Sequence, residues 1–208
     1  MSSSNLTINN IIFDLGGVLI DWNPYYLYRK IFTKDEEIAE FLAEVCTPQW
    51  NEEQDAGRPL AVATELMIQL HPSNEPEIRA YYGRWQEMLG NHFEDTVTIL
   101  EGLKKSGKYH LYALTNWSAE TFPVALERYN FLSWFEGIVV SGTEMTRKPF
   151  PEIFQIILKR YHISPETALL IDDSLRNLNG AKYCGISGIH FQSAGQLKID
   201  LEKWGIIY

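Results

Sequence analysis

Residues 11–19 read Ile-Ile-Phe-Asp-Leu-Gly-Gly-Val-Leu. Three apolar residues lead directly into the carboxylate of Asp14, and two glycines follow after Leu15. A short apolar run bounded in this way indicates a strand that is buried on both faces. Glycines also let backbone N–H groups come close to an anion. We therefore predict a buried strand with Asp14 at its carboxyl end and with Gly16 and Gly17 in an anion-binding turn.

Four further short apolar runs lie at residues 111–114, 137–140, 168–171 and 187–191. Longer segments with helical spacing of apolar residues separate them, such as residues 151–161, which a proline opens. Strands that alternate with helices build a parallel sheet with helices on both faces. The predicted fold class is α/β, with a doubly wound, Rossmann-like parallel sheet as the core.

Residues 23–93 interrupt this alternation, because they show helical patterns and no convincing strand. Ile38, Phe41, Leu42 and Val45, for example, are spaced as on one face of an amphipathic helix. We expect a small helical cap inserted into the core. The predicted division is residues 1–21 and 94–208 for the α/β catalytic core, and 22–93 for the cap.

Composition narrows the class of protein and its partners. The 208 residues carry a net charge of −9, so the surface as a whole repels nucleic acid and anionic membrane. Cys46 and Cys184 form neither a disulfide framework nor a zinc motif, and no window reaches the roughly 20 apolar residues of a membrane helix. We expect a cytoplasmic protein, a monomer or weak homodimer, without nucleic acid or membrane as partner.

Polar residues follow three more of the predicted strands. Thr115-Asn116 ends the second strand, Lys148 lies beyond the third, and Asp172-Asp173 ends the fourth. In an open parallel sheet, ligands bind beyond the carboxyl ends of the strands. Adjacent carboxylates repel each other unless a cation lies between them or one is protonated. Asp14, Asp173 and a backbone carbonyl offer only oxygen ligands, which suits Mg²⁺.

The order Asp14, Thr115, Lys148, Asp172-Asp173 resembles the four motifs of the haloacid dehalogenase superfamily, and the resemblance covers nearly the whole chain. The insertion after the first motif is similar to the helical cap of one large subgroup. The resemblance implies a magnesium-dependent phosphatase that acts on a small phosphorylated metabolite through an aspartyl-phosphate.

The resemblance also implies roles for individual residues. Asp14 would attack phosphorus, and Lys148 would neutralise charge on the phosphoryl group and the nucleophile. The phosphoryl oxygens would be held by Thr115, Asn116, and the N–H groups near Gly16 and Gly17. Mg²⁺ would be held by Asp14, the Gly16 carbonyl and Asp173, with Asp172 behind them.

Gly16 departs from the motif, because phosphatases of this superfamily usually carry a second Asp there that protonates the leaving group. We expect Asp21, or a cap residue such as Asp55, to supply the proton; the other accounts are an easy leaving group or a slow enzyme. Trp50 and Arg58, in a polar and aromatic patch of the cap, are expected to contact substrate. Their alternatives are cap core for Trp50 and a simple pairing with Asp55 for Arg58.

Two other functions stay open at this point. In a 2-haloacid dehalogenase, Asp14 would displace halide from carbon without a metal. Such enzymes also lack the second Asp, but they typically carry a tyrosine at the position of Gly16 and a Ser/Asn motif in place of the paired carboxylates. The third function is a non-catalytic protein of the same fold that binds phosphoesters, for which Gly16 is the only direct support.

Overall fold

The computed structural model describes residues 7–208. Five strands form a sheet in the order β5-β4-β1-β6-β7, and every neighbouring pair is parallel. They are β1 (Asn10–Phe13), β4 (His110–Thr115), β5 (Gly137–Val140), β6 (Ala168–Asp172) and β7 (Ser187–His190). The α/β fold class is thereby confirmed, and each predicted strand is found within one residue of its expected bounds.

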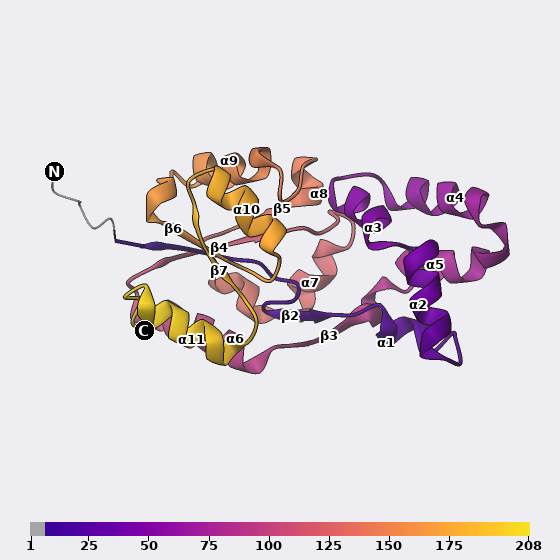
Figure 1. The fold of residues 1–208 in the computed structure, drawn as a ribbon, viewed down its shortest axis with the longest axis horizontal. Coiled ribbons are helices and arrows are strands. Elements are labelled where there is room, and N and C mark those ends of the chain that lie inside the picture. Colours follow the sequence, from indigo (N-terminus) through magenta and orange to yellow (C-terminus); the bar gives the residue numbers. More distant parts are fainter. Residues whose placement is uncertain (1–6) are drawn as a thin grey trace.

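Helices cover both faces of this sheet, with α9 and α10 on one side and α6 and α11 on the other (Figure 1). The core helices are α6 (Glu94–Ser106), α7 (Phe122–Arg128), α8 (Ser141–Glu144), α9 (Pro151–Arg160), α10 (Leu175–Tyr183) and α11 (Ala194–Lys203), with 3₁₀ turns η3 (Asn130–Trp134) and η4 (Pro165–Thr167).

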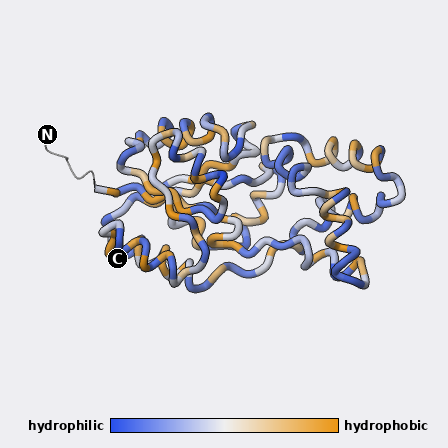
Figure 2. Tube along the Cα trace, in the orientation of Figure 1, coloured by the Kyte–Doolittle hydropathy of each residue, from blue (hydrophilic) through white to orange (hydrophobic). Residues whose placement is uncertain are grey.

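Alternate residues of the central strand supply two separate apolar layers. Ile12 belongs to the cluster that includes Phe154 of α9, whereas Ile11 and Phe13 belong to the cluster that includes Leu100 of α6. Successive side chains of a strand point to opposite faces, so a strand covered on both sides must be apolar throughout. Figure 2 shows this concentration of apolar residues in the crossing strands.

A helical insertion extends beyond the carboxyl end of the sheet (Figure 1). It comprises α1 (Tyr25–Tyr28), α2 (Asp35–Glu44), α3 (Pro48–Asp55), α4 (Leu60–Leu70), η1 (Pro72–Asn74), α5 (Glu75–Gly83) and η2 (Trp85–Met88). At the start of α3, Thr47 Oγ1 accepts a hydrogen bond from Trp50 N (3.1 Å), and Pro48 occupies the first turn. This capping fixes the helix that later supplies two cleft residues.

An antiparallel ribbon joins the insertion to the core. It pairs β2 (Ile20–Trp22) with β3 (Leu89–His92). The prediction of no strand within residues 23–93 is therefore wrong at β3. The segment holds a glycine and only one strongly apolar residue, Leu89, and it becomes a strand through pairing with β2 rather than through its own pattern.

Across the described part of the chain, no helix combines the length and the apolar character needed to cross a bilayer.

Candidate active site

Asp14 lies directly beyond the central strand. Its N–H donates to the carbonyl of Ile171 on neighbouring β6 (2.9 Å), so the parallel pairing itself fixes its position. The side chain is buried, and its Oδ1 accepts a hydrogen bond from Leu15 N (2.7 Å). A carboxylate at the end of the central strand is thus held in a fixed orientation.

Lys148 forms the centre of a buried charge cluster. Its Nζ lies 2.9 Å from Asp14 Oδ2 and 2.6 Å from Asp172 Oδ2, and its side chain is fully buried. Burial alone would lower the pKa of Lys148, but Asp14 and Asp172 outweigh that effect and raise it. The ammonium therefore stays charged and binds the carboxylates that end β1 and β6.

Two amide side chains orient this cluster. Asn116 Oδ1 accepts from Lys148 N (2.8 Å), and Asn116 Nδ2 donates to Lys148 O (3.0 Å). Asn177 Nδ2 donates to Asp172 Oδ1 (3.0 Å), which also accepts from Ser174 N (2.9 Å). Asn116, predicted to bind substrate, therefore holds the backbone of Lys148, and Asp172 has protein partners on both of its oxygens.

Three carboxylates and one ammonium leave this end of the sheet negatively charged. Oxygens of Asp14, Asp172 and Asp173 lie within 4.8 Å of one another. Burial, above all, raises the pKa of Asp14 to about 7; Asp172 and Asp173 add to the rise, and Lys148 opposes it. One lysine cannot neutralise three carboxylates. An oxygen-only donor set of this charge fits a divalent cation such as Mg²⁺.

The glycine turn brings Asp173 into the same group. Gly17 has a φ of +73°, and a Cβ there would lie 2.3 Å from Asp173 Oδ2. Its N–H donates to the carbonyl of Ile20 (3.0 Å). The prediction that the Gly17 N–H binds a phosphoryl oxygen is therefore corrected: Gly17 gives Asp173 room, and its donor is already used inside the turn.

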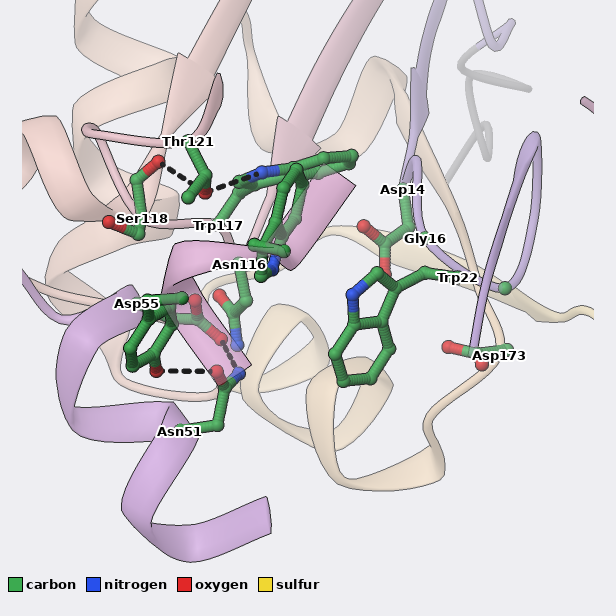
Figure 3. Close-up of a pocket in the computed structure, with 13 residues that line it drawn as sticks. Asp14, Gly16, Trp22, Asn51, Asp55, Asn116, Trp117, Ser118, Thr121 and Asp173 are labelled. Carbon is green, nitrogen blue, oxygen red and sulfur yellow. Dashed lines mark hydrogen bonds between the residues drawn. The ribbon is translucent and has the colours of Figure 1, made fainter. Parts of the chain in front are cut away.

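A cleft of about 270 Å³ opens above Asp14, between the core and the helical insertion (Figure 3). Its lining residues are Asp14, Gly16, Gly17, Trp22, Asn51, Asp55, Tyr82, Trp85, Asn116, Trp117, Ser118, Thr121 and Asp173. The strand-end residues form its floor, and α3, α5 and η2 supply the facing wall. A substrate bound here would contact both parts of the molecule.

Asp55 is the carboxyl group that the insertion presents to this cleft. Its Oδ2 accepts from Asn51 Nδ2 (3.0 Å), one helical turn earlier (Figure 3). Burial raises the pKa of Asp55 to about 7, with a further rise from Glu52 and an opposing effect of Arg147. A carboxylic acid with this pKa is partly protonated near neutral pH, as a proton donor must be.

Three predicted residues lie outside the cleft lining, for identifiable reasons. Trp50 is one position away from Asn51 on α3, so it faces the insertion core and packs against Tyr81 (5.1 Å between ring centroids). Arg58 turns back to Gln54 Oε1 (2.6 Å) rather than to substrate or Asp55. Asp21 lies on the opposite face of β2 from Trp22, where its Oδ2 accepts from the Tyr26 hydroxyl (2.5 Å).

Thr115 ends β4 and is buried beside this site, though it is not among the cleft-lining residues. Its contact with a phosphoryl oxygen stays a prediction.

Sequence reasoning missed part of the cleft. The missed lining residues are Trp22, Tyr82, Trp85, Ser118 and Thr121. They come from the ribbon, the insertion and the loop after β4, far apart in the chain. No local pattern marks them; the only usable signal is that Trp117 and Ser118 directly follow the second strand-end motif.

The sequence model for "Haloacid dehalogenase-like hydrolase" matches residues 11–191. The chain belongs to this family. The family predicted from the four strand-end motifs is therefore confirmed, and the match spans both the core and the insertion of this haloacid dehalogenase-like hydrolase.

Named relatives extend over most of the chain. A sesquiterpene phosphatase of Aspergillus oryzae is 29% identical over 199 residues, which are 95% of this chain and 96% of that protein. A phosphoglycolate phosphatase of Vibrio cholerae is 24% identical, covering 86% of this chain and 82% of its own length. The magnesium complex of a haloacid dehalogenase family enzyme from Bacteroides thetaiotaomicron is 25% identical, with a TM-score of 0.69 over 90% of this chain and 94% of that one.

Proposed function

We propose that this hydrolase is a magnesium-dependent phosphatase of small phosphate monoesters that works through an aspartyl-phosphate on Asp14. The carrying observation is the buried cluster in which Lys148 Nζ contacts both Asp14 Oδ2 and Asp172 Oδ2 while Asp173 lies close by. A fixed carboxylate beside an ammonium suits nucleophilic attack on a phosphoryl group.

The residues present fit a bound Mg²⁺. Asp14, Asp173 and the Gly16 carbonyl would hold it, and when bound it would offset the charge of the phosphoryl dianion and the carboxylates. Asp172 has both oxygens engaged by Lys148, Ser174 and Asn177, so we assign it to holding Lys148 in place.

The proposed reaction has two displacements at phosphorus. A carboxylate oxygen of Asp14 bonds to phosphorus while the bond from phosphorus to the ester oxygen breaks. Water then attacks the phosphorus of the aspartyl-phosphate, which releases inorganic phosphate and restores the carboxylate. Lys148 neutralises charge on the nucleophile and the phosphoryl oxygens throughout.

We assign the proton for the leaving group to Asp55. Gly16 has no side chain to supply it, and Asp21 lies outside the cleft beside Tyr26. Asp55 lines the cleft from α3, on the side from which the ester oxygen would depart. The insertion, rather than the motif loop, would then complete the reaction.

Relatives support phosphate ester chemistry and leave the substrate open. Both curated relatives are named phosphatases, one for phosphoglycolate and one for a sesquiterpene, and the Bacteroides enzyme was solved as a magnesium complex. The alternative of a 2-haloacid dehalogenase has the support of Gly16, where such enzymes also lack the second Asp. The paired carboxylates Asp172 and Asp173 count against it, because that reaction needs no cation.

One assay separates these functions. Phosphate release from a panel of phosphate monoesters and chloride release from a 2-chloro acid are measured with Mg²⁺ and with EDTA. We expect phosphate release that EDTA abolishes, and no chloride release. Chloride release that EDTA does not change would establish the dehalogenase instead, and binding of phosphate esters without any turnover would establish the non-catalytic alternative.

A further inference from the structure

Aromatic side chains form much of the cleft wall above the nucleophile (Figure 3). Trp22, Tyr82, Trp85 and Trp117 all line it, and the rings of Trp85 and Trp117 pack edge to face at 5.4 Å between centroids. Trp85 and Trp117 are buried, so their rings are supported from behind. A wall of this kind favours an apolar or aromatic group on the substrate.

Among the residues that the structure describes, no lysine, arginine or histidine lines the cleft. Lys148 lies beneath Asp14 with both carboxylate partners, and Arg147 pairs with Glu52 at 3.0 Å. The insertion side carries a carboxyl group, Asp55. A second anionic group on the substrate, such as a carboxylate or another phosphate, would therefore be desolvated without a counter-charge.

The polar side chains of the wall are already paired within the protein. Tyr82 OH donates to Asn51 Oδ1 (2.9 Å), and Asn51 Nδ2 donates to Asp55. Thr121 Oγ1 accepts from Trp117 Nε1 (3.1 Å). A sugar rich in hydroxyl groups would have to break these hydrogen bonds in order to make its own.

Trp22 differs from the other aromatic residues of the wall. Its Nε1 is buried and has no hydrogen-bond partner within residues 7–208. Figure 3 shows the indole close to Asp14, with the nitrogen facing the cleft. A buried N–H without a partner is unfavourable, and an oxygen of a bound substrate would satisfy it.

We propose that the cleft takes phosphate monoesters of an uncharged, largely apolar alcohol, such as a phenol or a short isoprenoid alcohol. The hydrocarbon body packs against Trp22, Trp85 and Trp117, and a substrate oxygen accepts the Trp22 N–H. This inference rests on the proposed phosphatase function and adds the substrate class to it. The cleft volume of about 270 Å³ limits the body to a compact group.

The test compares kcat/KM, in Mg²⁺, for phenyl phosphate and dimethylallyl phosphate with that for phosphoglycolate, glucose 6-phosphate and pyrophosphate. We expect values at least about ten-fold higher for the two apolar esters, because an uncompensated charge or unpaired polar group costs at least that much. Trp22→Phe keeps the ring and removes the N–H, and should lower kcat/KM for phenyl phosphate about ten-fold. Trp204→Phe, at the end of α11 and away from the cleft, is the matched control and should change nothing.

The outcomes distinguish the two claims. If the anionic or sugar esters are cleaved as well as the apolar ones, or if Trp22→Phe behaves like Trp204→Phe, the inference is overturned while the phosphatase function stands. If no ester releases phosphate in Mg²⁺, the proposed function fails and the inference fails with it.

Discussion

Gly16 stands two positions after Asp14, and it leaves the first strand-end motif without a second carboxyl group. The structure offers Asp55 and Asp21 as replacements, and only Asp55 lines the cleft. Its position on α3 means that proton donation depends on how the insertion is placed over the sheet. This arrangement makes a single side chain outside the motif responsible for the leaving group.

We predict that Asp55→Asn slows turnover of alkyl phosphates by about 10² to 10⁴, and of aryl phosphates far less, because a phenolate leaves without a proton. Asp21→Asn is the control and should affect both classes little. In the wild type, the alkyl rate should fall as pH rises above about 7, where Asp55, facing Glu52 and Arg147, loses its proton. Steady-state rates on matched alkyl and aryl esters check this. Equal losses on both classes, or a larger loss in Asp21→Asn, would refute it.

Gly17 provides a second test at the scale of one residue. An alanine there must adopt a φ of +73° and place its Cβ 2.3 Å from Asp173 Oδ2. We predict that Gly17→Ala displaces Asp173 and raises the Mg²⁺ concentration for half-maximal activity about ten-fold or more.

The matched control is Gly107→Ala at the end of α6. Gly107 also has a positive φ, of +63°, but nothing lies within 4 Å of an added Cβ. It should lose about 1 to 2 kcal/mol of stability from backbone strain without any change in Mg²⁺ requirement. If the two variants show the same Mg²⁺ requirement, Gly17 does not position Asp173.

At the scale of elements, the chain enters and leaves the insertion through the ribbon of β2 and β3. Ion pairs also cross between the two parts: Glu52 on α3 contacts Arg147 (3.0 Å) and Arg176. Because the floor of the cleft belongs to the core and Asp55 to the insertion, substrate binding should reduce motion between them.

We predict slower amide hydrogen exchange at residues 20–23 and 93–95 when Mg²⁺ and aluminium fluoride, a phosphoryl mimic, are bound together. Mass spectrometry of the wild type and of Asp173→Asn measures it, and the variant should show no protection. Unchanged exchange at both segments in the wild type would contradict a closing movement about the ribbon.

The elements also show how far sequence reasoning reaches. All five strands of the sheet were predicted, because a strand buried on both faces must be apolar along its whole length. β3 was missed, since Leu89–His92 has no such pattern and pairs with only one partner strand. Within the site, Asp14, Lys148, Asp172 and Asp173 were predictable because parallel strands bring their carboxyl ends together. Trp22, Tyr82 and Trp85 were not, since only the packing of the insertion brings them there.

At the scale of the whole molecule, a protein of net charge −9 has to bind a dianionic ester. Lys148 is the one buried lysine within the described residues, and it already serves two carboxylates. A bound divalent cation would supply the missing positive charge. The stability of the folded chain should therefore depend on Mg²⁺.

We predict that Mg²⁺ raises the thermal unfolding midpoint of the wild type, because a ligand that binds only the folded state stabilises it by about 2.7 kcal/mol at 100 times its Kd. Asp173→Asn, which removes one ligand charge, should show little rise, and sodium chloride of equal ionic strength should not reproduce it. Calorimetry measures the midpoints. An equal rise in both proteins would mean that the cation binds elsewhere.

The central claim is that Asp14 is the nucleophile of a metal-dependent phosphatase. Its most direct test is phosphate release from phenyl phosphate in Mg²⁺ by the wild type and by Asp14→Asn, with folding of both checked by circular dichroism. We predict release by the wild type that EDTA abolishes, and a rate for Asp14→Asn lower by a factor on the order of 10³ or more. A folded Asp14→Asn variant that keeps the wild-type rate would contradict the claim.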